Sequence, residues 1–136
     1  MKHFGEHLTL DGYHGNYDLL NSKEVVMDAL HDLTTELNMH ILGGPTVYFA
    51  GGNDLKDPGG WSGFVVIEES HISIHTFPAR GFLSADVYTC QNGLDQNLIK
   101  QFFRDRFMIE KEEVNFLIRG TRYPSENITG ATLQVS

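Results

Sequence analysis

The sequence predicts an α+β fold, a two-layer sandwich in which a mainly antiparallel sheet carries two helices on one face. Several segments of strand-like composition follow one another directly in the middle of the chain, and only two segments have the apolar spacing of a helix. Runs of strands, rather than strict alternation of strands and helices, are typical of antiparallel sheets covered on one face. At 136 residues, the chain is expected to form a single domain, 1–136.

The first two elements follow from local patterns. A strand is expected from Phe4 to Asp11, because the segment alternates weakly and ends at a turn dipeptide. Asn21 and Glu24 have the spacing of a helix capping box, and apolar residues at helical spacing follow them. We therefore expect a helix over about 22–38, with one apolar face turned to the sheet.

The rest of the chain supplies most of the sheet and the second helix. A strand from His40 to Ala50 is expected to be broken by Gly43-Gly44-Pro45, and residues 51–60 have the composition of a loop. Asp95 is a candidate cap for the second helix, whose aromatic stripe indicates a buried face. Residues from 121 onward are expected to form a loose tail. The remaining strands are expected at Trp61 to Glu69, His71 to Phe77, Gly81 to Cys90 and Glu113 to Gly120.

Composition excludes some partners. The net charge of −8 would repel nucleic acid and anionic membranes, so neither is expected as a partner. No apolar run approaches the roughly 20 residues that cross a bilayer, and no basic and apolar leader opens the chain. The single cysteine cannot form an internal disulfide. These features together predict a cytoplasmic protein.

The most informative stretch is Glu69-Ser70-His71-Ile72-Ser73-Ile74-His75-Thr76-Phe77-Pro78. Cys90 follows Ser70 by twenty residues, and Ser62 precedes it by eight. Taken singly, each of these side chains is more often structural than chemical. Taken together, the motif Glu-Ser-His-x-x-x-His-Thr-x-Pro with its cysteine resembles the self-cleaving segment of the prokaryotic S-adenosylmethionine decarboxylase family. Gly5-x-His7-Leu8 also resembles the opening of that family.

The resemblance implies a self-processing enzyme. In that family the chain is cut at the Glu-Ser bond, here Glu69-Ser70, and the serine becomes a covalent pyruvoyl group. The expected products are chains 1–69 and 70–136. His75 matches the base that removes the Cα proton of residue 70, a task that an imidazole can perform near neutral pH. Ser62 matches a second serine that assists processing, and Cys90 matches the proton donor in turnover.

The activity implied is decarboxylation in polyamine biosynthesis. The pyruvoyl carbonyl condenses with the α-amine of an amino-acid-type substrate as a Schiff base and accepts the electrons left by carbon dioxide. Two differences from the family's sequence pattern leave the identity of the substrate undetermined. Ala79 stands where the family has a ribose-binding glutamate, and a longer loop replaces the aromatic residue before the second serine. Phe49, Trp61 and Phe77 are candidate substrate-binding rings. S-adenosylmethionine and the alternative, L-arginine or L-ornithine, are about equally compatible with the sequence.

Strand geometry predicts a homodimer. If residues 70–77 form one straight strand, Ser70 and His75 lie about 16 Å apart and point to opposite faces. They then cannot meet within one subunit. A two-fold dimer resolves this when each site takes Ser70 and Cys90 from one chain and Ser62 and His75 from the other. The resemblance implies the same arrangement.

A metal site is not expected. His71 and His75 have zincin spacing only on a helix, and the β-branched residues between them favour a strand. On a strand the two imidazoles lie about 13 Å apart, too far to share one ion.

Other classes of protein fit less well. The sequence lacks the Gly-x-Ser-x-Gly elbow that would support an ordinary hydrolase. An inactive relative that regulates a true decarboxylase, or a plain ligand-binding module, would leave the Ser70, His75 and Cys90 set unexplained. Both of these alternatives predict an intact chain.

Overall fold

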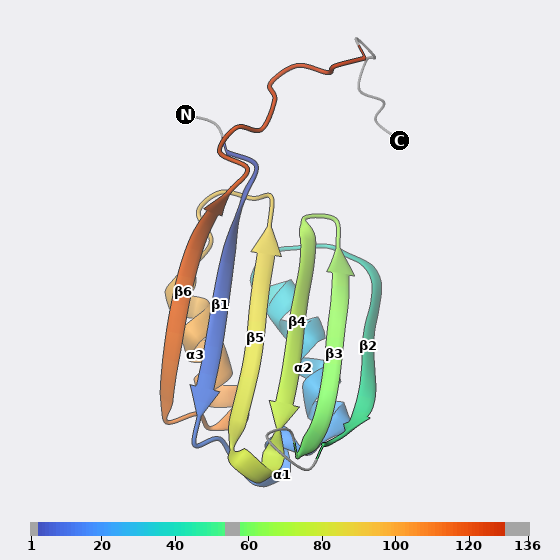
Figure 1. Ribbon diagram of the computed structural model, residues 1–136, viewed down its shortest axis with the longest axis vertical. Helices are drawn as coiled ribbons and strands as arrows, with labels where there is room; N and C mark the ends of the chain where they lie inside the picture. Colours follow the sequence, from blue (N-terminus) through green and yellow to red (C-terminus); the bar gives the residue numbers. More distant parts are fainter. Residues whose placement is uncertain (1–2, 54–57, 130–136) are drawn as a thin grey trace.

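The computed structural model describes residues 3–53 and 58–129. Within them, six strands form one sheet in which every neighbouring pair is antiparallel, in the order β2-β3-β4-β5-β1-β6 (Figure 1). The predicted α+β class is therefore confirmed. The strands are β1 Gly5–Tyr13, β2 Ile41–Gly51, β3 Gly59–Ile67, β4 Ser70–Phe77, β5 Phe82–Thr89 and β6 Lys111–Arg119.

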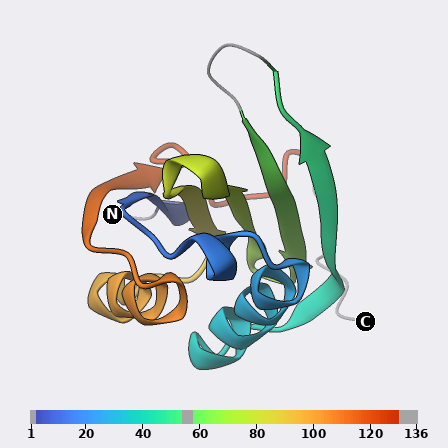
Figure 2. The same ribbon diagram turned by 90° about the horizontal axis from the view of Figure 1, so that it is seen from below.

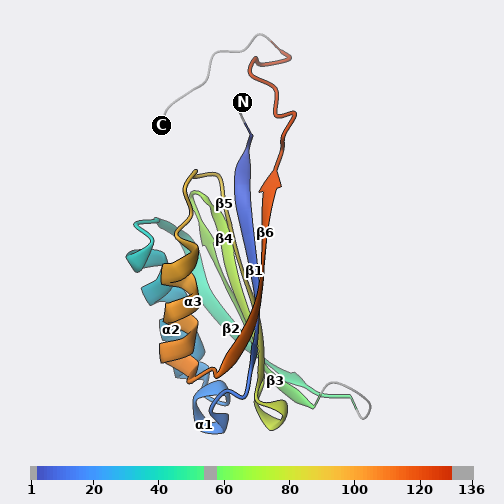
Figure 3. The same ribbon diagram turned by 90° about the vertical axis from the view of Figure 1, so that its left-hand side faces the viewer.

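Two long helices cover one face of the sheet. These are α2, Lys23–Glu36, and α3, Gln96–Phe107. Figures 2 and 3 show both on the same side, and no helix of the described residues covers the other face of the sheet. Two short elements, the helix α1 (Tyr17–Leu20) and the 3-10 turn η1 (Pro78–Arg80), lie at one end of the sheet. We call the uncovered side the open face.

Strand periodicity divides the side chains between the two faces. In β4, Ile72 and Ile74 are fully buried under the helices, whereas His71, Ser73 and His75 occupy the alternate positions on the open face. The aromatic stripe of α3 is core, as predicted, and Phe103 and Phe107 are fully buried. One hydrophobic core therefore lies between the sheet and the two helices.

Two local expectations need correction, and one short helix was not predicted. The cap of α2 is Ser22, whose Oγ accepts from Val25 N–H at 3.2 Å, whereas Asn21 ends α1. The strand at 41–51 is continuous, because two register shifts against β3 absorb the glycine-proline stretch. The helix α1 was not predicted, because it is one turn long and its main signal is the cap Asn16. The cap predicted at Asp95 is confirmed, with Leu98 N–H donating to its side chain at 3.0 Å.

Part of the predicted loop, residues 54–57, lies outside the described residues, as do 130–136 of the predicted tail. From 120 to 129 the chain contains turns and bends and no helix or strand. Among the described residues, the helices are all too short or too polar to cross a membrane.

Candidate active site

The predicted cleavage bond lies in the tight turn between β3 and β4. The backbone carbonyl of Glu69 accepts a hydrogen bond from the backbone N–H of Cys90 at 2.8 Å. This bond places Cys90 next to the bond between Glu69 and Ser70, although the two segments are twenty residues apart in sequence. The carbonyl carbon that a nucleophilic Ser70 would attack is thus already polarised by an N–H donor.

Ser70 has a backbone conformation that few non-glycine residues adopt. Its φ is +144°, in a region that L-amino acids occupy at a cost of about 1–3 kcal/mol. Such conformations cluster at functional sites, where the surrounding structure holds them. The strain lies at the residue that the motif marks as the nucleophile.

Ser62 and His75 meet on the open face. They are opposite one another in the pairing of β3 with β4, and Ser62 Oγ lies 2.9 Å from His75 Nδ1. In the tautomer whose Nδ1–H donates to Ser62 Oγ, Nε2 keeps a free lone pair that can accept a proton. The pair is therefore arranged as an oriented imidazole base.

The structure brings the predicted residues together as two pairs, not as one group of four. Ser70 pairs with Ile67 and Thr89 at the start of β4, whereas His75 pairs with Ser62 and Ser84 near its end. Five residues of extended strand separate Ser70 and His75 by about 16 Å. His75 alternates with Ser73 on the open face, and Ser70 is one position out of step with them. Within one subunit Ser70 and His75 do not meet.

A hollow of about 330 Å³ lies beside His75 on the open face. Its lining residues come from three neighbouring strands, β1, β4 and β5. Their side chains are almost all polar, so the hollow suits a small polar molecule. The lining residues are His7, Thr9, Ser73, His75, Ser84, Ala85 and Asp86.

A hydrogen-bond network around Asp86, which was not predicted from the sequence, borders this hollow. The Asp86 carboxylate contacts His7 Nε2 at 2.6 Å and His71 Nε2 at 3.2 Å, and it also accepts from the Ser73 hydroxyl. The four residues of the network come from three strands, β1, β4 and β5, so only the strand pairing joins them. The sequence did contain one signal for this network: Asp86 is a carboxylate between Ala85 and Val87, on the polar side of an alternating strand.

The same network bears on metal binding. The ligand atoms of His7, His71 and Asp86 lie within 4.8 Å of one another. Arg119, however, contacts His7 Nδ1 at 3.1 Å, and a guanidinium can only donate. This fixes His7 as the tautomer whose Nε2 carries a proton, which it donates to Asp86. In this arrangement the His7 nitrogen that faces the cluster has no lone pair for a metal.

The three candidate substrate-binding rings lie at the His75 end of the sheet. Phe49 and Trp61 are cross-strand partners with ring centroids 5.2 Å apart, and Trp61 adjoins Ser62. Their strand positions belong to the helix-covered face, whereas Phe77 shares the face of His75. Phe77 packs on Phe82, with the two ring centroids 5.5 Å apart. Of the three, Phe77 occupies the strand position best placed to border the hollow.

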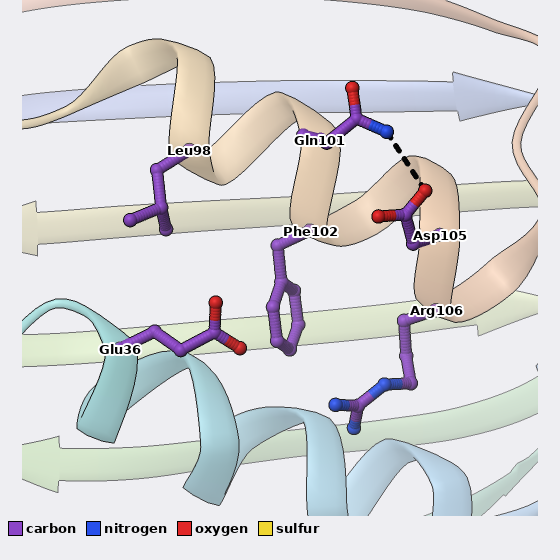
Figure 4. A pocket seen from close by; sticks show the side chains of 6 residues that line it. All are labelled: Glu36, Leu98, Gln101, Phe102, Asp105 and Arg106. Atoms are coloured by element: carbon purple, nitrogen blue, oxygen red, sulfur yellow. Dashed lines mark hydrogen bonds between the residues drawn. The ribbon is translucent and has the colours of Figure 1, made fainter.

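A second hollow, of about 420 Å³, lies in the helical layer (Figure 4). It is formed between the end of α2 and the exposed side of α3, and Gln101 Nε2 donates to Asp105 there at 2.8 Å. None of the predicted site residues lines it. We therefore place the candidate active site at the sheet, in two halves. The lining residues of the second hollow are Glu36, Leu98, Gln101, Phe102, Asp105 and Arg106.

The chain is similar to known proteins in sequence and in fold. Residues 6–120 match the family model described as S-adenosylmethionine decarboxylase. An S-adenosylmethionine decarboxylase proenzyme of Clostridium botulinum (strain Langeland) is 31% identical over 120 residues, covering 88% of this chain and 97% of the relative. A proenzyme of the same description from Geobacillus sp. (strain WCH70) is 33% identical over 122 residues, covering 90% and 92%.

The fold has a solved counterpart. The crystal structure of the adenosylmethionine decarboxylase from Aquifex aeolicus superimposes with a TM-score of 0.73, covering 93% of this chain and 98% of that one. At 24% sequence identity, this likeness concerns the fold alone.

Proposed function

The chain belongs to the S-adenosylmethionine decarboxylase family of pyruvoyl-dependent carboxy-lyases, and from that premise we propose that it cuts itself between Glu69 and Ser70. The new N-terminus at residue 70 becomes the pyruvoyl group, and the processed protein decarboxylates an amino-acid-type substrate. One observation carries the proposal. The Glu69 carbonyl accepts the Cys90 N–H at 2.8 Å next to a Ser70 at positive φ.

The first step is an acyl shift. Ser70 Oγ adds to the Glu69 carbonyl carbon, and the Cys90 N–H stabilises the oxyanion that develops on its oxygen. The C–N bond then breaks, which leaves an ester between Glu69 and the Ser70 side chain and frees the Ser70 amine. Breaking this bond also relieves the backbone strain at Ser70, which favours the step.

The second step needs a base. Removal of the Cα proton of residue 70 expels the Glu69 carboxylate and leaves dehydroalanine, which tautomerises to an imine. Water hydrolyses the imine to the pyruvoyl group and ammonia. His75 is the proposed base, and Ser62 orients its ring.

Turnover uses the half of the site that contains Ser70 and Cys90. The pyruvoyl group supplies an electron sink for the electrons that remain when carbon dioxide leaves. The Cys90 thiol is the proposed donor of the proton that replaces the carboxylate on the substrate carbon. Cys90 directly follows β5 and is exposed, so its thiol is accessible to a small molecule.

A shared dimer site follows from the same geometry. Ser70 and Cys90 lie at one end of β4, and Ser62 and His75 near the other, so a two-fold axis can combine the halves from two chains. The open face supports this, because no helix in the described part of the chain covers it and it exposes apolar side chains beside the polar hollow. Phe64 is 42% exposed and Leu117 52% exposed on this face.

Two substrate classes fit the proposal. S-adenosylmethionine is named by the relatives, whereas L-arginine and L-ornithine need no ribose or adenine contact. Ala79 is exposed in η1 at the His75 end of β4, and its methyl group cannot accept hydrogen bonds from ribose hydroxyls. Unpaired buried hydroxyls would cost about 1–3 kcal/mol each. We name S-adenosylmethionine first, with arginine or ornithine as the alternative.

The test compares substrates on the processed protein. Intact-mass measurement should find the 1–69 chain and a 70–136 chain blocked by pyruvoyl. Release of carbon dioxide is then measured with S-adenosylmethionine, arginine and ornithine side by side. A chain that stays whole after prolonged incubation would contradict the proposal and favour a regulatory relative or a binding module.

A further inference from the structure

The Glu69 side chain, next to the proposed cleavage bond, is held at both carboxylate oxygens by one residue. The His40 backbone N–H donates to Oε1 at 3.1 Å, and His40 Nδ1 lies 2.9 Å from Oε2. The Glu69 side chain is 9% exposed, whereas that of His40 is 68% exposed. We propose that His40 is a positioning residue for self-cleavage, which holds Glu69 so that its carbonyl stays on the Cys90 N–H. This inference rests on the proposed self-cleavage.

Contacts to residues 40 and 90 restrain Glu69. His40 immediately precedes β2, and its own carbonyl accepts Glu68 N–H at 2.8 Å. The backbone on one side of Glu69 and its carboxylate are thus both fixed to residue 40, while its carbonyl is fixed to residue 90. The carbonyl carbon has to stay within reach of Ser70 Oγ, and a displacement near 1 Å can slow a reaction by about 100-fold.

The charges favour the paired state over a wide pH range. Burial works to raise the pKa of the Glu69 carboxyl, but the hydrogen bonds from His40 outweigh it and hold this pKa below the ordinary value. The hydrogen bond to Glu69 and its charge raise the pKa of His40, and Glu68 Oε2, 3.7 Å away, adds to this. The ion pair is therefore lost as pH falls through the lowered pKa of Glu69. It is also lost as pH rises through the raised pKa of His40.

Replacement of His40 separates a positioning role from a general structural one. His40→Ala removes the imidazole but keeps the backbone N–H, whereas His40→Asn keeps a neutral N–H donor near the place of Nδ1. Cleavage is followed by pulse labelling during cell-free synthesis of the full chain and gel separation of the products. We expect His40→Ala to cleave about 10- to 100-fold more slowly than the unchanged chain. His40→Asn should recover most of the rate.

A matched control uses another exposed histidine paired with a carboxylate. His31 Nδ1 lies 3.1 Å from Asp32 on α2, and its side chain is 59% exposed. His31→Ala should cleave at the unchanged rate. The ratio of the His40→Asn rate to the unchanged rate should rise at alkaline pH, because only the histidine loses its charge there.

Hydroxylamine identifies the affected step, because it cleaves the ester at residue 70 but not the peptide bond between Glu69 and Ser70. The slow His40→Ala chain should resist hydroxylamine, since formation of the ester is what the anchor assists. Cleavage of folded His40→Ala at the unchanged rate, or accumulation of its ester, would overturn the inference. So would a His40→Asn chain that folds, as judged by circular dichroism, and yet is as slow as His40→Ala. An unchanged chain that never cleaves would instead contradict the proposed function.

Discussion

The Ser62 hydroxyl and the His75 imidazole form a 2.9 Å hydrogen bond across the neighbouring strands β3 and β4. The two residues face one another in register, so any change of pairing would separate them. Ser70, on the same strand as His75, lies about 16 Å away. The proposed base and the proposed nucleophile are therefore positioned by one strand for two different sites.

Replacement of the base should stop processing after its first step. In His75→Ala the acyl shift can still occur, but the Cα proton of residue 70 is not removed. We expect an ester-linked chain of unchanged mass that hydroxylamine splits, with pyruvoyl formation slowed at least 100-fold. Hydroxylamine treatment followed by mass measurement checks this, with His31→Ala as the control. Normal processing of His75→Ala would remove His75 from the mechanism.

Cys90→Ala should separate processing from turnover. The substitution keeps the backbone N–H that binds the Glu69 carbonyl, so self-cleavage should proceed at nearly the unchanged rate. Turnover should fall about 100-fold or more, because the proton donor is lost. Mass measurement of the processed chains and a carbon dioxide assay on one preparation test both halves. Equal loss of both functions would contradict the division of roles between the Cys90 backbone and side chain.

The positive φ of Ser70 predicts an order of stability among variants that cannot cleave. Neither Ser70→Gly nor Ser70→Ala has a hydroxyl, so both should stay intact. Glycine adopts φ of +144° without strain, so Ser70→Gly should have the higher free energy of unfolding, by about 1 kcal/mol, in urea titrations. Ser84, inside β5, is the control, and there alanine should be the more stable. If the alanine variant were the more stable at position 70 as well as at position 84, this result would argue against strain at Ser70.

Mixed dimers test the shared site. When Ser70→Ala and His75→Ala chains are co-expressed, one site of each mixed dimer combines an intact Ser70 with an intact His75. We expect nearly all of the His75→Ala chains in purified mixed dimers to be cleaved, and none of the Ser70→Ala chains, because the His75→Ala chain contributes the intact Ser70 of the one complete site. Differently tagged chains allow the mixed dimers to be isolated before mass measurement. Mixed dimers that form without any cleaved chain would contradict sharing between subunits.

The sequence by itself determined the class of fold and the chemistry to look for. Alternation from His71 to Phe77 and the apolar spacing of 98–107 act over a few residues, so they predict a strand and a helix without knowledge of the rest. The strand assignment also set the separation of Ser70 from His75, because the rise per residue is fixed. The cap at Asn21 was wrong by one residue, since neighbouring Asn and Ser side chains both suit that position.

Only the tertiary structure decided which side chains meet. His40 and Glu69 are 29 residues apart, and His7 and Asp86 are 79 apart. Such neighbours depend on strand order and register, which are set by burial of one whole face of the sheet against α2 and α3 and not by local preference. A slip of one residue between β3 and β4 would leave every strand intact and still separate Ser62 from His75. The motif could therefore name the reacting residues, whereas the oriented imidazole, the polarised Glu69 carbonyl and the Asp86 network exist only in the paired sheet.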